Sequence, residues 1–480
     1  MSKLTRRDFV KTSVAAMASI TIAGTKSSGR VLGANDAVRV AVVGLNGRGS
    51  AHVAAYDRMD GVEIRYLVDP DTRTFARRVE QIQNGAAPRT VQDVRRALED
   101  RNVDAISVAT PNHWHALMTV WGAQAGKHVY VEKPASHNVK EGRIALEMAR
   151  RHNVIVQHGT QSRSDSAWIN TIAAIQSGRY GRLLVSRGLV YKRRATIGTR
   201  PTTKPPAEVD FNLWTGPAQQ TAFHTNLIHY NWHWFWAFGN GDIGNQGVHQ
   251  MDIARWAIPN ATLPTSVVCV GGRFGYTDQG ETPNTQIAFM DFGQTKLIFE
   301  VRGLVTGNYR GTRNGSNNAF HLEQGVIIDH RFYPGGGEAS EAIPQMNAPR
   351  GPGGGNHFAN FIAAVRSGRR ADLNADIENG HYSSALCHLA NISYRLGENV
   401  AFSPRTGAFG DNAAANETLQ RMEEHLAHAP HSLRLADIQC HVGRRLELNT
   451  QAETFTGNAD ANRLLTREYR AGFVVPDRVG

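Results

Sequence analysis

Short apolar runs alternate with amphipathic stretches over the first third of the chain. The apolar runs cover residues 38–43, 62–68, 103–109 and 128–131, and stretches with helical spacing cover residues 50–59, 91–98, 116–125 and 141–152. Buried parallel strands appear in sequences as continuous apolar runs, and helices usually connect them. We therefore expect an α/β fold over residues 35–158, a doubly wound parallel sheet of the Rossmann type.

From about residue 160 the pattern changes to strands in which apolar and polar residues alternate. Such strands are expected at residues 183–191, 266–274, 286–292 and 296–301, and helices at 358–366 and 377–396. Alternation is typical of antiparallel sheets with one solvated face. We expect an α+β domain on a mostly antiparallel open sheet over residues 159–404, and an extension over 405–480 that packs on both domains. The open sheet also predicts a homo-oligomer.

The N-terminus has the features of a targeting segment. Arg6 and Arg7 are followed by Phe9 and then by an uncharged stretch over residues 12–24. This combination predicts a twin-arginine (Tat) signal and linker over residues 1–34, and therefore a periplasmic or otherwise exported protein. An amphipathic N-terminal helix is the alternative, but the stretch lacks charges and helical periodicity. No later segment is apolar for the length that a membrane helix needs, so we expect no integral membrane segment after signal removal.

Composition narrows the classes of function. The 53 Lys and Arg residues outnumber the 42 Asp and Glu residues, but they occur as scattered pairs without interleaved aromatics, so no nucleic-acid partner is expected. The 3 cysteines show no CxxC spacing, which excludes a zinc knuckle and a disulfide framework. The 20 histidines include no HExxH motif, and no metal site is expected.

A glycine-rich turn follows the first apolar run. Its spacing is G-x-x-G-x-G, and the second strand ends at an acidic residue where the ribose of a dinucleotide would lie. The expected cofactor-binding residues here are Gly44, Asn46, Gly47, Arg48, Gly49 and Asp69. A carboxylate at the ribose favours NAD over NADP, because a 2'-phosphate would meet like charge. Arg48 and Arg73 leave NADP as the less favoured alternative.

Two further motifs follow the next two strands. They are TPNHWH at residues 110–115 and EKP at residues 132–134. Both fall at carboxyl ends of parallel strands, the edge where an open α/β sheet binds ligands. The expected cofactor-binding residues are Thr110, Asn112, His115, Glu132 and Lys133, and His113 is expected to contact substrate.

The second domain carries an aromatic and histidine-rich segment and an N-x-G-x-H motif at residues 245–249. Together with the glycine turn, TPNHWH and EKP, this pattern resembles the Gfo/Idh/MocA oxidoreductase family, and residues 380–395 and 461–470 resemble a bacterial C-terminal subtype. The resemblance implies that Lys133 and His249 are catalytic. It places Asn245 beside the reacting hydroxyl as well. The aromatic segment either stacks on a sugar or belongs to the core, and its residues His229, Tyr230 and His233, together with His113, are expected as polar contacts to substrate. The family generally has Asp where this chain has Asn245; an amide cannot act as a base, so proton transfer should fall to His249 or Lys133.

Export combined with a dinucleotide fold has a mechanistic consequence. A periplasm offers no pool of free cofactor, so the resemblance implies an NAD-dependent oxidoreductase that carries NAD out and regenerates it on a sugar, glycoside or polyol. Coupled oxidation and reduction of two sugars is one route. A glycoside hydrolase cycle of transient oxidation, elimination, hydration and reduction is another. A dehydrogenase that uses free NAD and a non-catalytic sugar- or nucleotide-binding protein are the alternatives.

Overall fold

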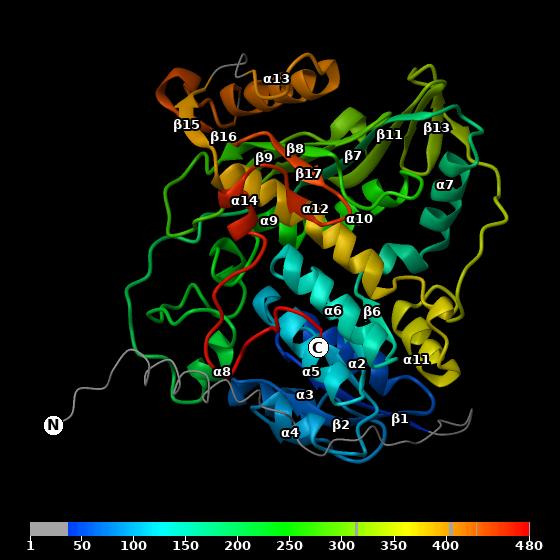
Figure 1. Ribbon diagram of the computed structural model, residues 1–480, viewed down its shortest axis with the longest axis vertical. Helices are drawn as coiled ribbons and strands as arrows, with labels where there is room; N and C mark the ends of the chain where they lie inside the picture. Colours follow the sequence, from blue (N-terminus) through cyan, green and yellow to red (C-terminus); the bar gives the residue numbers. More distant parts are fainter. Residues whose placement is uncertain (1–36, 313–314, 403–406, 429, 480) are drawn as a thin grey trace.

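A computed structural model describes residues 37–312, 315–402, 407–428 and 430–479 (Figure 1). The signal and linker predicted over residues 1–34 lie outside the described residues. The N-terminal domain lies at the bottom of Figure 1, and the larger sheet of the second domain lies above it. Among the described residues, no helix combines the length and apolar character needed to cross a bilayer.

The N-terminal domain is a six-stranded sheet with the order β3-β2-β1-β4-β5-β6. All neighbouring strands in it are parallel. The strands are β1 (Val38–Val43), β2 (Val62–Val68), β3 (Arg89–Val91), β4 (Ala105–Val108), β5 (His128–Val131) and β6 (Val156–His158). The helices between them are α2 (Arg48–Asp57), α3 (Phe75–Val79), α4 (Val94–Leu98), α5 (His115–Gln124) and α6 (Val139–Arg151). The predicted doubly wound Rossmann sheet is confirmed.

Each face of this sheet is covered by helices and by a segment from late in the chain. On one face, Val40 and Val42 share an apolar cluster with Tyr56 of α2 and with Phe358 and Phe361 of α11 (His357–Ser367). On the other face, the cluster contains α4, α5 and α6 together with Phe473 and Val475 of the C-terminal tail. In Figure 1 the tail, drawn in red, runs from α14 down past α8 and then turns to end at the C-terminus beside α5. Burial of these aromatic side chains ties the end of the chain to the first domain.

The second domain is built on a twelve-stranded mixed sheet. Its strands are β7 (Leu183–Tyr191), β8 (Ser266–Gly272), β9 (Thr285–Phe292), β10 (Thr295–Arg302), β11 (Ser316–Leu322), β12 (Gly325–Ile328), β13 (Arg331–Pro334), β14 (Glu341–Ala342), β15 (Glu398–Ala401), β16 (Gln439–Val442), β17 (Leu446–Asn449) and β18 (Thr454–Phe455). The pairs are antiparallel except β7 with β10, which is parallel. The other helices are α7 (Ser166–Gln176), α8 (Phe211–Thr215), α9 (Gly241–Asn245), α10 (Gly247–Trp256), α12 (Ile377–Arg395), α13 (Ala413–Ala427) and α14 (Ala459–Arg463). The prediction of a mostly antiparallel second sheet is confirmed.

The outer face of the large sheet is less open than its alternating strands suggested. Leu419, Met422 and Leu426 of α13 pack on Val270 and Phe289 of the sheet, and α13 lies across this face in Figure 1. The amphipathic helix buries the apolar positions that alternation leaves on the outer side. Association of copies through this face would have to accommodate α13, and the homo-oligomer stays a prediction.

The predicted domain limits also stay predictions, and two segments cross them. Within residues 159–404, α11 packs on the first sheet. Within residues 405–480, β16 and β17 pair with β8 and so extend the second sheet. Neither arrangement is visible in local sequence patterns, because both depend on contacts between distant parts of the chain.

Candidate active site

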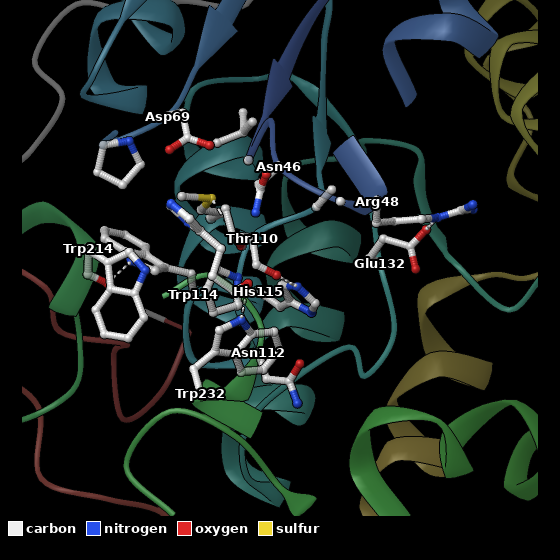
Figure 2. A pocket seen from close by; sticks show the side chains of 18 of the residues that line it. Asn46, Arg48, Asp69, Thr110, Asn112, Trp114, His115, Glu132, Trp214 and Trp232 are labelled. Carbon is white, nitrogen blue, oxygen red and sulfur yellow. Dashed lines mark hydrogen bonds and ion pairs between the residues drawn. The ribbon is translucent and has the colours of Figure 1, made fainter. Parts of the chain in front are cut away.

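A cavity of about 420 Å³ lies at the carboxyl ends of the parallel strands, and residues of both domains line it (Figure 2). Val43, Val68 and Glu132 mark the ends of β1 and β2 and the residue after β5. Loops at this edge of a doubly wound sheet converge, which makes it the usual ligand site of the fold. The second domain closes the cavity with residues from 213–214, 229–232 and 245–249.

The three turn glycines differ in what surrounds them. A Cβ on Gly44 would lie 2.7 Å from the carbonyl carbon of Ala109, and one on Gly49 would lie 1.8 Å from the Gly44 oxygen. Gly47 has a φ of +37° and nothing within 4 Å of its Cβ position. Gly44 and Gly49 therefore allow the turn, strand and helix to pack closely, whereas Gly47 leaves space beside the start of α2. That space and the free N–H groups of the helix terminus fit a dinucleotide pyrophosphate.

All but one of the predicted residues in and around the glycine turn line the cavity. Gly44, Asn46, Gly47, Arg48 and Asp69 line the cavity. Gly49 is not in its wall and acts through packing.

Asp69 directly follows β2 and joins it to the glycine turn. Its Oδ2 accepts a 2.7 Å hydrogen bond from the Leu45 N–H, and its Oδ1 accepts a 2.9 Å bond from the Asp71 N–H. Burial raises the pKa of the Asp69 carboxyl, and these two N–H groups oppose that rise. Arg73 is held by Asp71 in a two-pronged ion pair. Arg73, one of the two arginines that leave NADP as an alternative, therefore already has a carboxylate partner.

Glu132 and Arg48 form an ion pair at the cavity wall. The Arg48 Nε lies 2.7 Å from Glu132 Oε1, and His52 Nε2 lies 3.1 Å from the same oxygen; Figure 2 shows the Arg48–Glu132 contact. Burial alone would raise the pKa of Glu132, but the hydrogen bond from His52 and the charge of Arg48 hold it well below its usual range. The pair fixes the residue next to Lys133, because a buried carboxylate with two partners has little freedom to move.

Lys133 and His249 come together from the two domains. The Lys133 Nζ donates a 2.9 Å hydrogen bond to the Asn245 carbonyl oxygen, and Lys133, Asn245 and His249 all line the cavity. Burial lowers the pKa of Lys133, and burial together with the charge of Lys133 lowers the pKa of His249 to about 3. His249 is thus a neutral imidazole at neutral pH, able to accept a proton. The peptide bond between Lys133 and Pro134 is cis.

Asn245 and His249 lie one helical turn apart, as their spacing predicts for a helical segment. α9 ends at Asn245 and α10 begins at Gly247, and Gln246 between them keeps helical angles of φ −74° and ψ −40°. The Asn245 Nδ2 lies 3.4 Å from the Tyr230 hydroxyl, which also accepts a 3.1 Å bond from Arg194. The amide is therefore held as a hydrogen-bonding group beside a phenol.

His229 connects the aromatic segment to the first domain. Its Nε2 lies 2.7 Å from Asp71 Oδ2, and both His229 and Tyr230 line the cavity. These two residues are where the sequence placed substrate contacts.

Two predicted substrate residues lie outside the cavity wall. The ring nitrogens of His113 lie 3.3 Å from the Phe238 carbonyl and 3.0 Å from the Trp214 carbonyl. The His233 Nδ1 lies 2.7 Å from the Tyr230 carbonyl. Both imidazoles are buried and hold backbone of the second domain, so their predicted contact with substrate finds no support in their placement.

Thr110, Asn112 and His115 all line the cavity. The His115 ring lies between two backbone carbonyls, 2.6 Å from Pro134 O and 2.8 Å from Thr110 O. His115 thereby joins the two strand-end motifs. Because His115 is buried and contacts a carbonyl of each motif, we infer that it holds the two motifs in position.

The sequence did not single out three tryptophans in the wall. Trp114, Trp214 and Trp232 line the cavity and are labelled in Figure 2. The Trp114 Nε1 donates a 3.1 Å bond to the Trp214 carbonyl, which links TPNHWH to α8. Trp114 and Trp232 stood inside motifs that the sequence highlighted, whereas Trp214 had no local signal. The described residues contain no group of three or more His, Cys, Asp or Glu side chains placed to hold a metal ion.

Two family models match the chain. Residues 38–160 match one described as an oxidoreductase family with an NAD-binding Rossmann fold. Residues 190–273 and 340–429 match its counterpart, described as an oxidoreductase family C-terminal alpha/beta domain. The first match covers the glycine turn, TPNHWH and EKP, and the second covers Asn245 and His249.

Curated relatives and a solved structure agree with these matches. A glycosyl hydrolase family 109 protein of Shewanella pealeana is 27% identical over 206 residues, 38% of this chain and 45% of the relative. The scyllo-inositol 2-dehydrogenase (NAD(+)) of Bacillus subtilis is 30% identical over 173 residues, 36% of this chain and 47% of the relative. This chain spans less than half the length of either relative. A levoglucosan dehydrogenase solved in complex with NADH superposes with a TM-score of 0.55 at 17% identity, covering 74% of this chain and 97% of that one.

Proposed function

The chain belongs to the Gfo/Idh/MocA oxidoreductase family, and from that premise we propose that it oxidises a hydroxyl of a sugar, glycoside or polyol with NAD. One observation carries the proposal: Lys133 and the neutral His249 face one cavity with the glycine turn. Proton acceptors beside a dinucleotide site are what oxidation of an alcohol needs.

Each of these residues would have a separate role in the proposed oxidation. Gly47 and the start of α2 would hold the pyrophosphate, and Asp69 would hold the ribose. NAD supplies the hydride chemistry when bound. Lys133 accepts the hydroxyl proton in its neutral form, which its lowered pKa favours. Asn245 orients the hydroxyl through its amide.

The glycoside hydrolase cycle is the second candidate. Two proton acceptors stand side by side, since Lys133 bonds to the Asn245 carbonyl and His249 lies one turn further along. A cycle of transient oxidation, elimination, hydration and reduction needs proton transfer at a hydroxyl and at the neighbouring C–H. The likeness to glycosyl hydrolase family 109 proteins supports this candidate.

Export through the Tat route is part of the proposal. It rests on Arg6, Arg7, Phe9 and the uncharged residues 12–24. An exported enzyme of this kind would retain its NAD through many turnovers. Association into a homo-oligomer is also proposed.

The test is a substrate screen with purified protein. Sugars, methyl glycosides and polyols are mixed with protein and NAD, and the absorbance and fluorescence of reduced nicotinamide are followed. The proposal expects a change with at least one hydroxyl substrate, absent in Lys133→Ala. Sugar binding without any change in this signal would favour the non-catalytic binding protein, for which Asn245 is the motivating residue.

A further inference from the structure

A second cavity, of about 410 Å³, lies behind the active-site pocket. Its wall comes from the C-terminal half of α12, the chain after α14 and residues 236–240 near α9, which lie close together in Figure 1. Asn240 separates it from the first cavity: Asn240 lines the rear cavity and accepts a 3.3 Å bond from Asn112, which lines the front one. A volume of this size is in the range of small-molecule sites.

Three polar side chains in this wall each have one buried atom without a hydrogen-bond partner in the part of the chain that the structure describes. The Nε2 of His137, the Nδ1 of His388 and the Oδ1 of Asn391 are buried, and none has a hydrogen-bond partner among the described residues. Buried polar atoms are nearly always satisfied, and each unsatisfied one costs about 1–3 kcal/mol. Three such atoms around one cavity indicate that polar groups of a ligand or water complete them.

The bonding of these side chains shows what they offer. Arg467 Nη1 lies 3.1 Å from His137 Nδ1, and a guanidinium can only donate. Burial and the charge of Arg467 hold the pKa of His137 well below its usual range, although the Gly239 backbone opposes this, so the ring is neutral and its remaining proton is on Nε2. The Asn391 Nδ2 donates to the Asn240 carbonyl at 2.8 Å, which leaves Oδ1 as an acceptor. The cavity therefore presents at least one donor and one acceptor, the mixture that hydroxyl groups require.

The charge of the wall is positive. Arg395, Arg463 and Arg467 line it, against one carboxylate, Glu468, and the exposed Arg463 already pairs with Asp460. Arg467 is half-buried and donates to the Ala237 carbonyl at 3.0 Å. The charge of the buried Glu141 acts on Arg467, but no carboxylate of the described residues forms a direct ion pair with it. A half-buried guanidinium with no direct ion pair can still bind the carboxylate of a ligand.

An aromatic ring completes the wall. Trp236 lines the cavity, and the Arg395 guanidinium lies 5.2 Å from the centre of its ring. Indole rings contact the apolar faces of sugars while polar neighbours bind the hydroxyls.

We propose that this rear cavity binds a small polyhydroxylated carboxylate, such as a sugar acid, with its carboxylate on Arg467 and its hydroxyls on His137, His388 and Asn391. The site is distinct from the active-site pocket and does not depend on the proposed reaction. The hydrogen-bonded pair of Asn240 and Asn112 lies between the two cavities.

The test is calorimetric titration of the full chain, saturated with NAD, with glucuronate, glucose and inorganic phosphate. Glucuronate should bind at millimolar concentration or below. Arg467→Met should weaken binding by about tenfold or more, because it removes a charge-assisted hydrogen bond, and Arg467→Lys should restore part of it. The control Arg101→Gln removes an exposed arginine and should bind like the wild type. His249→Ala tests for binding in the front cavity and should also leave glucuronate affinity unchanged.

Several outcomes would overturn the proposal. These are no glucuronate binding, binding that His249→Ala weakens and Arg467→Met does not, and equal affinity for glucose. Equal affinity for phosphate would show an oxyanion site without sugar recognition and would overturn the polyol part. If Arg467→Met fails to fold, Arg395→Met at the exposed rim gives the same comparison, with a smaller loss expected.

Discussion

The Lys133 ammonium donates a 2.9 Å hydrogen bond to the carbonyl oxygen of Asn245, across the boundary between the two domains. Lys133 follows β5 of the Rossmann sheet, and Asn245 ends α9 of the second domain. The bond places the amine at the helical segment that carries His249 one turn further along, and both residues line the same cavity. In the proposed oxidation, proton transfer would therefore depend on how the second domain packs against the first.

Replacement of Lys133 by Ala should lower kcat by a factor of about 10² or more, as expected when a proton-transfer group is lost. NAD affinity should change little, because the glycine turn and Asp69 are intact. Steady-state kinetics and cofactor titration measure the two quantities. Lys140→Ala is the control, since Lys140 is a surface residue paired with Asp477. Near-normal turnover in Lys133→Ala would remove the lysine from the mechanism.

The pH profile should separate Lys133 from His249 as the proton acceptor. His249 has a pKa of about 3 and is already neutral from pH 5 upward, so it adds no change in that range. Burial puts the pKa of Lys133 below its ordinary value of 10.5, and the neutral amine forms as pH rises through it. We expect kcat/KM for oxidation to rise with pH through an apparent pKa below 10.5. A flat profile from pH 5 to 10 would point to His249.

Local patterns were enough to predict the first domain and the edge that carries the site. The strands at 38–43 and 62–68 match β1 and β2 to the residue, because buried parallel strands are continuous apolar runs. Gly44, Asp69, Thr110 and Lys133 were then expected together, since carboxyl ends of parallel strands share one edge. The family match confirms the fold and the NAD-binding domain.

Contacts between residues far apart in the sequence could not be predicted from local patterns. His113 and His115 stand two residues apart, yet only His115 lines the cavity, because a 3-10 turn at Asn112–Trp114 directs His113 toward the carbonyls of Phe238 and Trp214. The His229–Asp71 contact joins residues 158 apart in sequence. Neither hydrophobic periodicity nor a sequence motif predicts such pairs of contacting residues.

Asp69→Asn should reduce the preference for NAD over NADP. The amide oxygen can still accept from the Leu45 N–H, but the negative charge that binds a ribose diol and repels a 2'-phosphate is gone. We expect NAD affinity to fall by roughly tenfold, the scale of one charge-assisted hydrogen bond, and NADP affinity to rise. Fluorescence titration with both cofactors measures this. Asp93→Asn is the matched control, because Asp93 also lines the cavity and instead caps α4. Equal or tighter NADP binding by the wild type would contradict the assignment.

The free energy of unfolding should fall as pH drops below about 6.5, the ordinary pKa of histidine. Burial lowers the pKa of His128 to about 4, and its Nδ1 accepts a 3.0 Å bond from the Ile155 N–H. The unfolded state binds this proton first, so the stabilisation is complete above pH 6.5 and is lost toward pH 4. His128→Gln keeps an acceptor for the Ile155 N–H but cannot be protonated. The free energy of unfolding should therefore fall by about 1–2 kcal/mol less between pH 7.5 and pH 5 in this variant than in the wild type. Urea unfolding of both proteins at the two pH values checks this, and an unchanged pH dependence would contradict it.

The last prediction is a closed redox cycle, in which the protein keeps its NAD bound from one turnover to the next. It follows from the export signal predicted at Arg6 and Arg7 together with the Rossmann fold. NAD that survives export must bind with a sub-micromolar dissociation constant, about −8 kcal/mol or better. Extensively dialysed protein should therefore turn over a glycoside or a pair of sugars for many cycles without added NAD. Solvent deuterium distinguishes the routes: the hydrolase cycle places deuterium on the carbon next to the one transiently oxidised, whereas coupled turnover oxidises one sugar as it reduces another. Lys133→Ala is the control and should be inert in both. If dialysed protein is inactive and added NAD is consumed in proportion to sugar, the cofactor exchanges freely and the enzyme is an ordinary dehydrogenase.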